Sequence, residues 1–107
     1  MRELAGYVSA VPGCSIRAAL RGVGLPECGQ GHVRPIRRAL TAGLIIEDRD
    51  NPWARKPAYA LFRNERDRAI FNLRKELLHG GSSPARAAQI RAEVEVLRAE
   101  QASTWVA

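Results

Sequence analysis

The chain has 107 residues, with 17 Lys or Arg against 11 Asp or Glu, a net charge of +6 and 46% hydrophobic residues. This composition and length are typical of one small globular domain that carries a short additional segment, and the composition excludes a disordered chain. The longest apolar run, residues 58–62, is far shorter than the ~20 residues of a membrane helix, and no secretory leader is visible. We therefore expect a soluble, cytoplasmic protein that does not associate with membranes.

The positive charge is concentrated in the middle of the chain. Residues 17–63 hold nine basic residues against four acidic ones, whereas residues 64–107 hold seven against six. The pI is near 10.3, which indicates a polyanionic partner, and nucleic acid is the commonest one. The asymmetry predicts a basic domain over residues 1–63 and a helical extension over residues 64–107.

The cysteines do not form a disulfide framework, because there are only two, Cys14 and Cys28. His32 and His79 are the only histidines, and Cys28 and His32 are the only close pair among these four residues. A structural zinc site needs two close pairs of ligands. We expect two buried or half-buried thiols, and we predict neither a metal nor another cofactor.

Two helices are predicted at the start of the chain. Leu4, Tyr7, Val8 and Val11 fall at i, i+3, i+4 and i+7, which is one apolar helical stripe, and the following Pro-Gly pair ends it. Ser15 is the expected N-cap of the second helix. This helix repeats the same spacing up to residue 23, and Gly22 and Gly24 lie where it should stop. Residues 25–31 form a turn rich in Gly and Pro.

The third predicted helix, residues 33–42, has two chemically distinct faces. It begins near His32 or Val33, has Pro35 in its first turn and stops at Gly43. A helical wheel places apolar residues on one side and Arg34, Arg37, Arg38 and Thr41 on the other. The apolar side comprises Val33, Ile36, Ala39 and Leu40. Arginines on one helix face are often only solvated, but no acid interrupts residues 32–44, which favours an anionic partner.

A β-hairpin is predicted after the third helix. Leu44–Ile46 is a β-branched run suited to a strand, residues 50–52 mark a turn, and Pro57 opens a second strand over residues 58–62. The loop of about eight residues is longer than usual. It carries the basic residues Arg49, Arg55 and Lys56, and acids that should lie off any phosphate interface, namely Glu47, Asp48 and Asp50. Trp53 should fold back over the hairpin or meet another subunit, with insertion against a sugar or base as the alternative.

Two amphipathic helices are predicted in the extension. Ile70, Leu73 and Leu77 share one face of the first, and Gly80 and Gly81 follow its end. Ser83 and Pro84 start the second helix as N-cap and first residue, and its apolar seam comprises Ala87, Ile90, Val94, Leu97 and Gln101. Its charged residues, Arg91, Glu93, Glu95, Arg98 and Glu100, are expected to form a solvated flank. We expect a homodimer through residues 64–107, the alternative being a monomer whose tail covers the first helix.

From Ser15 to Phe62 the sequence resembles a winged helix-turn-helix domain. The pattern is a capped helix, a turn, a helix ending in Arg38-Ala39-Leu40-Thr41-Ala42-Gly43-Leu44-Ile45, and a strand containing Ala58-Tyr59-Ala60-Leu61. This entry into the wing and the Tyr-x-Leu strand are similar to bacterial regulators of the multiple-antibiotic-resistance and arsenic-repressor type, and to small phage DNA-binding proteins. The turn of residues 25–31 is longer than in a simple helix-turn-helix. The expected fold is mainly α with a small β-hairpin, a winged core followed by a two-helix extension.

The resemblance implies a recognition helix in the major groove of double-stranded DNA, over residues 33–42. Base contacts would come from Arg34, Arg37, Arg38 and Thr41. Backbone contacts would come from Ser15, Arg17, Arg21, Arg49, Arg55 and Lys56. The predicted function is a small transcriptional regulator of bacterial or phage type. The alternatives are a protein–protein interaction module and an excisionase or replication accessory. No catalytic motif and no effector site is identifiable, so no enzymatic activity is predicted.

Overall fold

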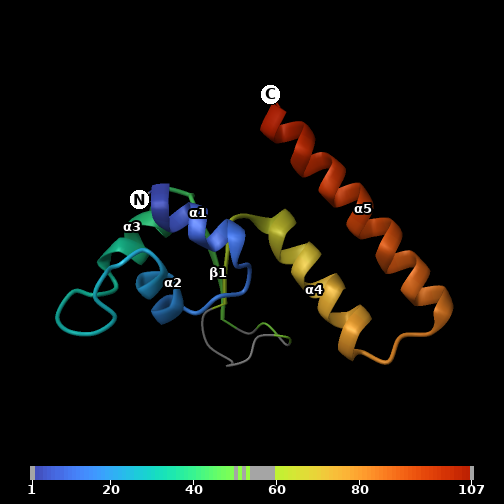
Figure 1. Cartoon of the computed structure of the whole chain (residues 1–107), viewed down its shortest axis with the longest axis horizontal. Coiled ribbons are helices and arrows are strands. Elements are labelled where there is room, and N and C mark those ends of the chain that lie inside the picture. Colours follow the sequence, from blue (N-terminus) through green and yellow to red (C-terminus); the bar gives the residue numbers. More distant parts are fainter. Residues whose placement is uncertain (1, 50, 52, 54–59, 107) are drawn as a thin grey trace. The chain divides into compact units, whose positions relative to one another are not determined.

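The computed structural model in Figure 1 describes residues 2–49, 51, 53 and 60–106. These residues form five α-helices and one antiparallel pair of strands, so the predicted mainly α fold with a small β-hairpin is confirmed. The elements in chain order are α1 (Arg2–Ala10), α2 (Ile16–Gly22), α3 (Arg34–Thr41), β1 (Ile46–Asp48), β2 (Ala60–Phe62), α4 (Glu65–His79) and α5 (Pro84–Val106). In the part of the chain described, no helix combines the length and apolar character needed to cross a bilayer.

The chain divides into two compact units, residues 1–68 and 69–107. The N-terminal unit contains α1, α2, α3 and both strands, and the C-terminal unit contains most of α4 and all of α5. The sequence placed this division after residue 63, just before α4, whereas the observed division falls in the first part of α4.

Serine side chains cap two of the helices at their N-termini. The Ser15 hydroxyl accepts a hydrogen bond of 3.1 Å from the backbone N–H of Ala18 at the start of α2. Ser83 accepts one of 3.2 Å from the N–H of Arg86 at the start of α5. Both caps confirm the predicted helix starts, because each hydroxyl satisfies an N–H group that has no partner within its helix.

The end of α3 is closed by a glycine in the left-handed region. Gly43 has φ +73°. The Gly43 N–H donates to the Leu40 carbonyl at 3.1 Å, and the Leu44 N–H donates to the Ala39 carbonyl at 3.0 Å. This pair of bonds is the Schellman arrangement, which satisfies the last free carbonyls of a helix. The end of α2 has the same two bonds around Gly24, whose φ is +75°.

The predicted first strand, Leu44–Ile46, is shifted in the structure to Ile46–Asp48. Leu44 cannot join the ladder, because its N–H closes α3 and its carbonyl accepts a 2.6 Å hydrogen bond from Arg63 Nη1. Ile45 is buried in the core instead. Pairing begins with Ile46 opposite Phe62 and continues to Asp48 opposite Ala60. Residues 58 and 59 of the predicted second strand lie outside the described residues.

Strand β2 also pairs with a residue far earlier in the chain. The Leu61 N–H donates to the Cys14 carbonyl at 2.9 Å, and the Gly13 N–H donates to the Leu61 carbonyl at 2.8 Å. Leu61 therefore has a backbone partner on each side, Cys14 on one and β1 on the other. This pairing joins the start of α2 to the closing strand, and no local sequence pattern predicts it.

The core of the N-terminal unit is built by all three of its helices and by the hairpin. Its buried members are Leu4, Ala5, Val8, Cys14, Ala19, Leu20, Ile36, Ala39, Ile45 and Leu61. Val11 does not extend the stripe as predicted, because α1 ends at Ala10 and the Val11 side chain is 43% exposed. Packing of α1 against α2 and α3 (Figure 1) fixes which face of α3 is turned inward.

The C-terminal unit is a helical hairpin. Helices α4 and α5 run in opposite directions from the connection at residues 80–83 (Figure 1), and Ile70 and Ile90 are buried. Arg86 donates to both carboxylate oxygens of Glu76, from Nε at 3.1 Å and from Nη2 at 3.0 Å. This two-pronged contact links the first turn of α5 to the last turn of α4.

Candidate nucleic-acid interface

Helix α3 has one buried apolar face and one exposed polar face, as the sequence predicted. Ile36 is 1% exposed and Ala39 is fully buried in the core. On the opposite side, Arg34, Arg37, Arg38 and Thr41 are all exposed. The apolar face fixes the rotation of the helix about its axis, so the polar face points out of the unit.

The three arginines of α3 have no charged or hydrogen-bonded partner among the residues that the structure describes. Among the described residues, no ion pair and no side-chain hydrogen bond involves Arg34, Arg37 or Arg38. Other arginines of this unit are paired, Arg49 with Glu47 and Arg68 with Glu65. The hydrogen-bond donors of the α3 face are therefore available to an external acceptor.

The preceding turn approaches α3 closely at Gly31. This residue has φ +74°, and a Cβ there would lie 3.1 Å from Nε of Arg34. The Arg34 side chain thus lies against the backbone of Gly31, and a side chain at residue 31 would displace it by a few tenths of an ångström. The same turn has an internal contact of 2.8 Å between Nδ1 of His32 and the Gly29 carbonyl.

The start of α2 presents a second group of exposed polar residues. Ser15 and Arg17 are both exposed. The Ser15 hydroxyl uses its oxygen as the cap acceptor, which leaves its O–H as a donor. Arg17 has no ion pair with any described residue. These groups are suited to contact a phosphate, which is the role predicted for them.

Arg21 has a partner that the sequence analysis did not assign. Its Nε and Nη2 donate to Oε1 of Glu27 at 3.1 and 2.8 Å. This hydrogen bond lowers the pKa of the Glu27 carboxyl, so the pair stays ionised at neutral pH. A phosphate contact by Arg21 would have to share or break the pair. Periodicity could not reveal it, because Glu27 lies six residues on, beyond the end of α2.

The acids at the base of the hairpin are engaged with nearby donors. Arg49 Nε donates to Glu47 at 2.7 Å, and Asn51 Nδ2 donates to Asp48 at 2.9 Å. Trp53 is half-buried, and its backbone N–H donates to Oδ1 of Asn51 at 2.9 Å. Arg55, Lys56 and Asp50 were also singled out in the sequence, and they lie outside the described residues.

The cysteines occupy different environments. Cys14 is buried as predicted, and burial raises the pKa of its thiol to about 11. The same prediction is wrong for Cys28, which is exposed because it lies in the turn between α2 and α3. Within the described ranges, no three His, Cys, Asp or Glu side chains are grouped so that they could hold a metal ion.

The candidate site is thus the exposed face of α3, with Ser15 and Arg17 as a second set of donors. Its guanidinium and hydroxyl groups are hydrogen-bond donors of the kind that can bind phosphate oxygens and base edges. Comparison with protein-family models, curated proteins and solved structures found no match.

Proposed function

We propose that the protein is a winged-helix DNA-binding protein that places α3 in the major groove and acts as a small transcriptional regulator of bacterial or phage type. The observation that carries this proposal is the exposed arginine face of α3. It holds three guanidinium groups without an internal partner among the described residues, on a helix whose other face is buried. Regulation of transcription would place the protein in the cytoplasm.

The dimensions of α3 support duplex DNA as the ligand. Arg34 and Thr41 are seven residues apart on one face, a rise of about 10 Å along the helix axis. This length spans about three base-pair steps of 3.4 Å. Arginine donates two hydrogen bonds to O6 and N7 of guanine, which only the major groove presents together. The face can therefore read about three adjacent base pairs.

Phosphate contacts are assigned to residues outside α3. Arg17 and the Ser15 O–H at the start of α2 would bind the backbone and hold α3 in register. Arg49 is exposed beside Glu47 and would add a contact from the hairpin. Arg21 and Arg49 would each have to share or break an existing ion pair to do so, because Glu27 and Glu47 already accept their hydrogen bonds.

The proposal includes a second copy of the chain, bound through the C-terminal unit. Val96 and Leu78 are 57% and 70% exposed, and Val96 lines a shallow apolar depression on α5 with Ala92 and Leu97. Exposed apolar surface of this kind favours association. Two copies would present two α3 helices to a palindromic site.

The test is selection of bound duplexes from a random pool, followed by measurement of affinity against salt concentration. We expect a shared palindromic motif and affinity that falls steeply with salt. Arg37→Ala should lose about 1–3 kcal/mol of discrimination at one base position. Arg17→Ala should weaken all sequences alike and reduce the salt slope by about one.

Lys75→Ala is the matched control, because it removes the same charge from α4. It should leave both the motif and the discrimination unchanged. Equal, uniform losses from Arg37→Ala and Arg17→Ala would remove α3 as the reading helix. Absence of duplex binding at low salt would contradict the proposal and favour a protein–protein interaction module instead.

A further inference from the structure

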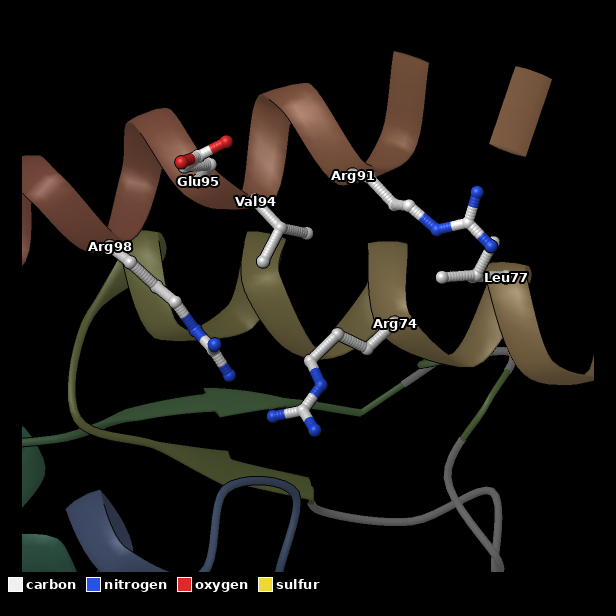
Figure 2. Close-up of a pocket in the computed structure, with 6 residues that line it drawn as sticks. All are labelled: Arg74, Leu77, Arg91, Val94, Glu95 and Arg98. Atoms are coloured by element: carbon white, nitrogen blue, oxygen red, sulfur yellow. The ribbon is translucent and has the colours of Figure 1, made fainter. Parts of the chain in front are cut away.

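The C-terminal unit contains a groove lined by three arginines. Arg74 and Leu77 of α4 line it from one side, and Arg91, Val94, Glu95 and Arg98 of α5 line it from the other; its volume is about 410 Å³. Figure 2 shows Arg74 and Arg98 directing their guanidinium groups to the same side of the hairpin, while Arg91 extends toward Leu77 and Glu95 turns away. The groove thus combines a cationic rim with apolar side chains.

None of the three guanidinium groups is neutralised by a described residue. No ion pair or side-chain hydrogen bond involves Arg74, Arg91 or Arg98 in the described part of the chain. The same hairpin does pair its arginine where an acid is placed for it, since Arg86 binds Glu76 through two hydrogen bonds. The groove lining carries three guanidinium groups and one carboxylate, and this carboxylate, Glu95, forms no ion pair with them among the described residues. The excess positive charge favours a bound anion.

The two α5 arginines of the groove lie on one side of the apolar seam. At 100° per residue, Arg91 and Arg98 flank this side of the seam together with Glu95, and Glu93 and Glu100 flank the other. From the sequence, all of these charged residues were expected to form a solvated flank. The sequence does contain one indication that Arg91 and Arg98 lie together. They are seven residues apart, which places them along the same side of a helix.

We propose that this groove binds a phosphate-bearing ligand, with Arg74 and Arg98 holding the phosphate oxygens and Leu77 and Val94 contacting an apolar part such as a base or sugar. Three arginines and one glutamate line the groove, an excess charge that matches a phosphate monoester dianion. Guanidinium binds phosphate with two parallel hydrogen bonds, which a single lysine cannot do. The groove volume lies within the range of small-ligand sites.

The phosphate could belong to a free nucleotide or to a nucleic-acid strand, and the test separates the two. The full chain, labelled with ¹⁵N, is titrated with adenosine 5′-monophosphate, with adenosine, and with a short oligodeoxyadenylate that lacks a terminal phosphate. We expect saturable shifts of the Arg74 and Arg98 Nε–H signals with a phosphate-bearing probe and none with adenosine. Tighter binding of the monophosphate identifies a free monoester, and tighter binding of the oligonucleotide identifies a strand.

Substitutions in and beside the groove test whether the ligand binds there. Arg74→Gln combined with Arg98→Gln should weaken binding by at least about tenfold. Lys75→Gln removes the same kind of charge next to Arg74, from a side chain that lies over Phe71 instead of in the groove, and should change affinity less than about twofold. Arg37→Ala should leave these shifts intact, so failure here and failure of the DNA proposal are distinguishable. Equal effects of the groove and Lys75 variants, binding of adenosine as strong as that of the monophosphate, or no shift at millimolar probe would overturn the assignment.

Discussion

Cys14 shows how one residue connects distant parts of the fold. Its backbone pairs with Leu61, and its side chain lies in the core beside the helices. Burial raises the pKa of the thiol from its ordinary value of 9.0 to about 11, because the core disfavours the thiolate. The thiol therefore stays neutral at physiological pH.

This raised pKa predicts a loss of stability in alkali. The unfolded chain releases the proton near pH 9.0 and the folded chain near pH 11, so the contribution of Cys14 is fully present below pH 9 and is lost as the pH rises toward 11. Linkage gives a loss of about 2–3 kcal/mol in the free energy of unfolding. Urea denaturation of the wild type and of Cys14→Ala across this range measures it. Cys28→Ala should retain the wild-type slope, and an unchanged slope in Cys14→Ala would contradict the prediction.

For individual residues, the sequence predicted which side chains are exposed on α3 but not every side-chain interaction. Arg34, Arg37 and Arg38 could be placed because Ile36 and Ala39 set the rotation of one continuous helix. The Arg21–Glu27 pair could not, since it forms across a turn whose path no periodic pattern describes. The Arg74 and Arg98 groups share a groove only because two helices pack, which a wheel of either helix alone cannot show.

The helices were predicted more accurately than the strands, for a physical reason. The start and end of a helix are determined by residues within one or two turns, and caps such as Ser15 and Gly43 can be recognised from the adjacent sequence. The start of β1 depends instead on more distant residues. The Leu44 N–H is used in closing α3 and the Leu44 carbonyl accepts from Arg63, so neither group can pair with β2. Local β-propensity therefore placed the strand two residues too early.

Substitution by alanine should change the stability of the fold in opposite directions at two glycines in neighbouring helices. At Gly22 a Cβ would collide with the Tyr7 ring, whereas at Gly6 no atom lies within 4 Å. Gly22→Ala should destabilise the fold by about 1 kcal/mol, because Tyr7 must leave its packed position. Gly6→Ala should stabilise it by about 0.5–1 kcal/mol, because alanine loses less backbone entropy in a helix. Thermal unfolding of both variants checks the pair, and stabilisation by Gly22→Ala would show that Tyr7 can move without cost.

At the scale of the whole molecule, the proposed homodimer depends on the exposed apolar surface of the C-terminal unit. Val96→Glu should weaken self-association by at least about tenfold, since it puts a charge where the proposed contact excludes water. Val11→Glu is the matched control, because Val11 is also an exposed valine, at 43%, but belongs to the N-terminal unit. Light scattering after size-exclusion chromatography measures the mass. A monomeric wild type, or equal effects of both variants, would contradict the homodimer.

The backbone pairing between residues 13–14 and Leu61 predicts that the N-terminal unit completes its core late during synthesis. Leu61 belongs to the same core that buries Ile36 and Ala39, so the first three helices lack part of their packing until β2 has emerged. Contacts this distant in sequence form late, after the intervening loop has closed. A nascent chain still short of residue 60 on the ribosome would therefore carry α3 without its complete packing, and the positions of the α3 arginines would be fixed only after the closing strand has left the exit tunnel.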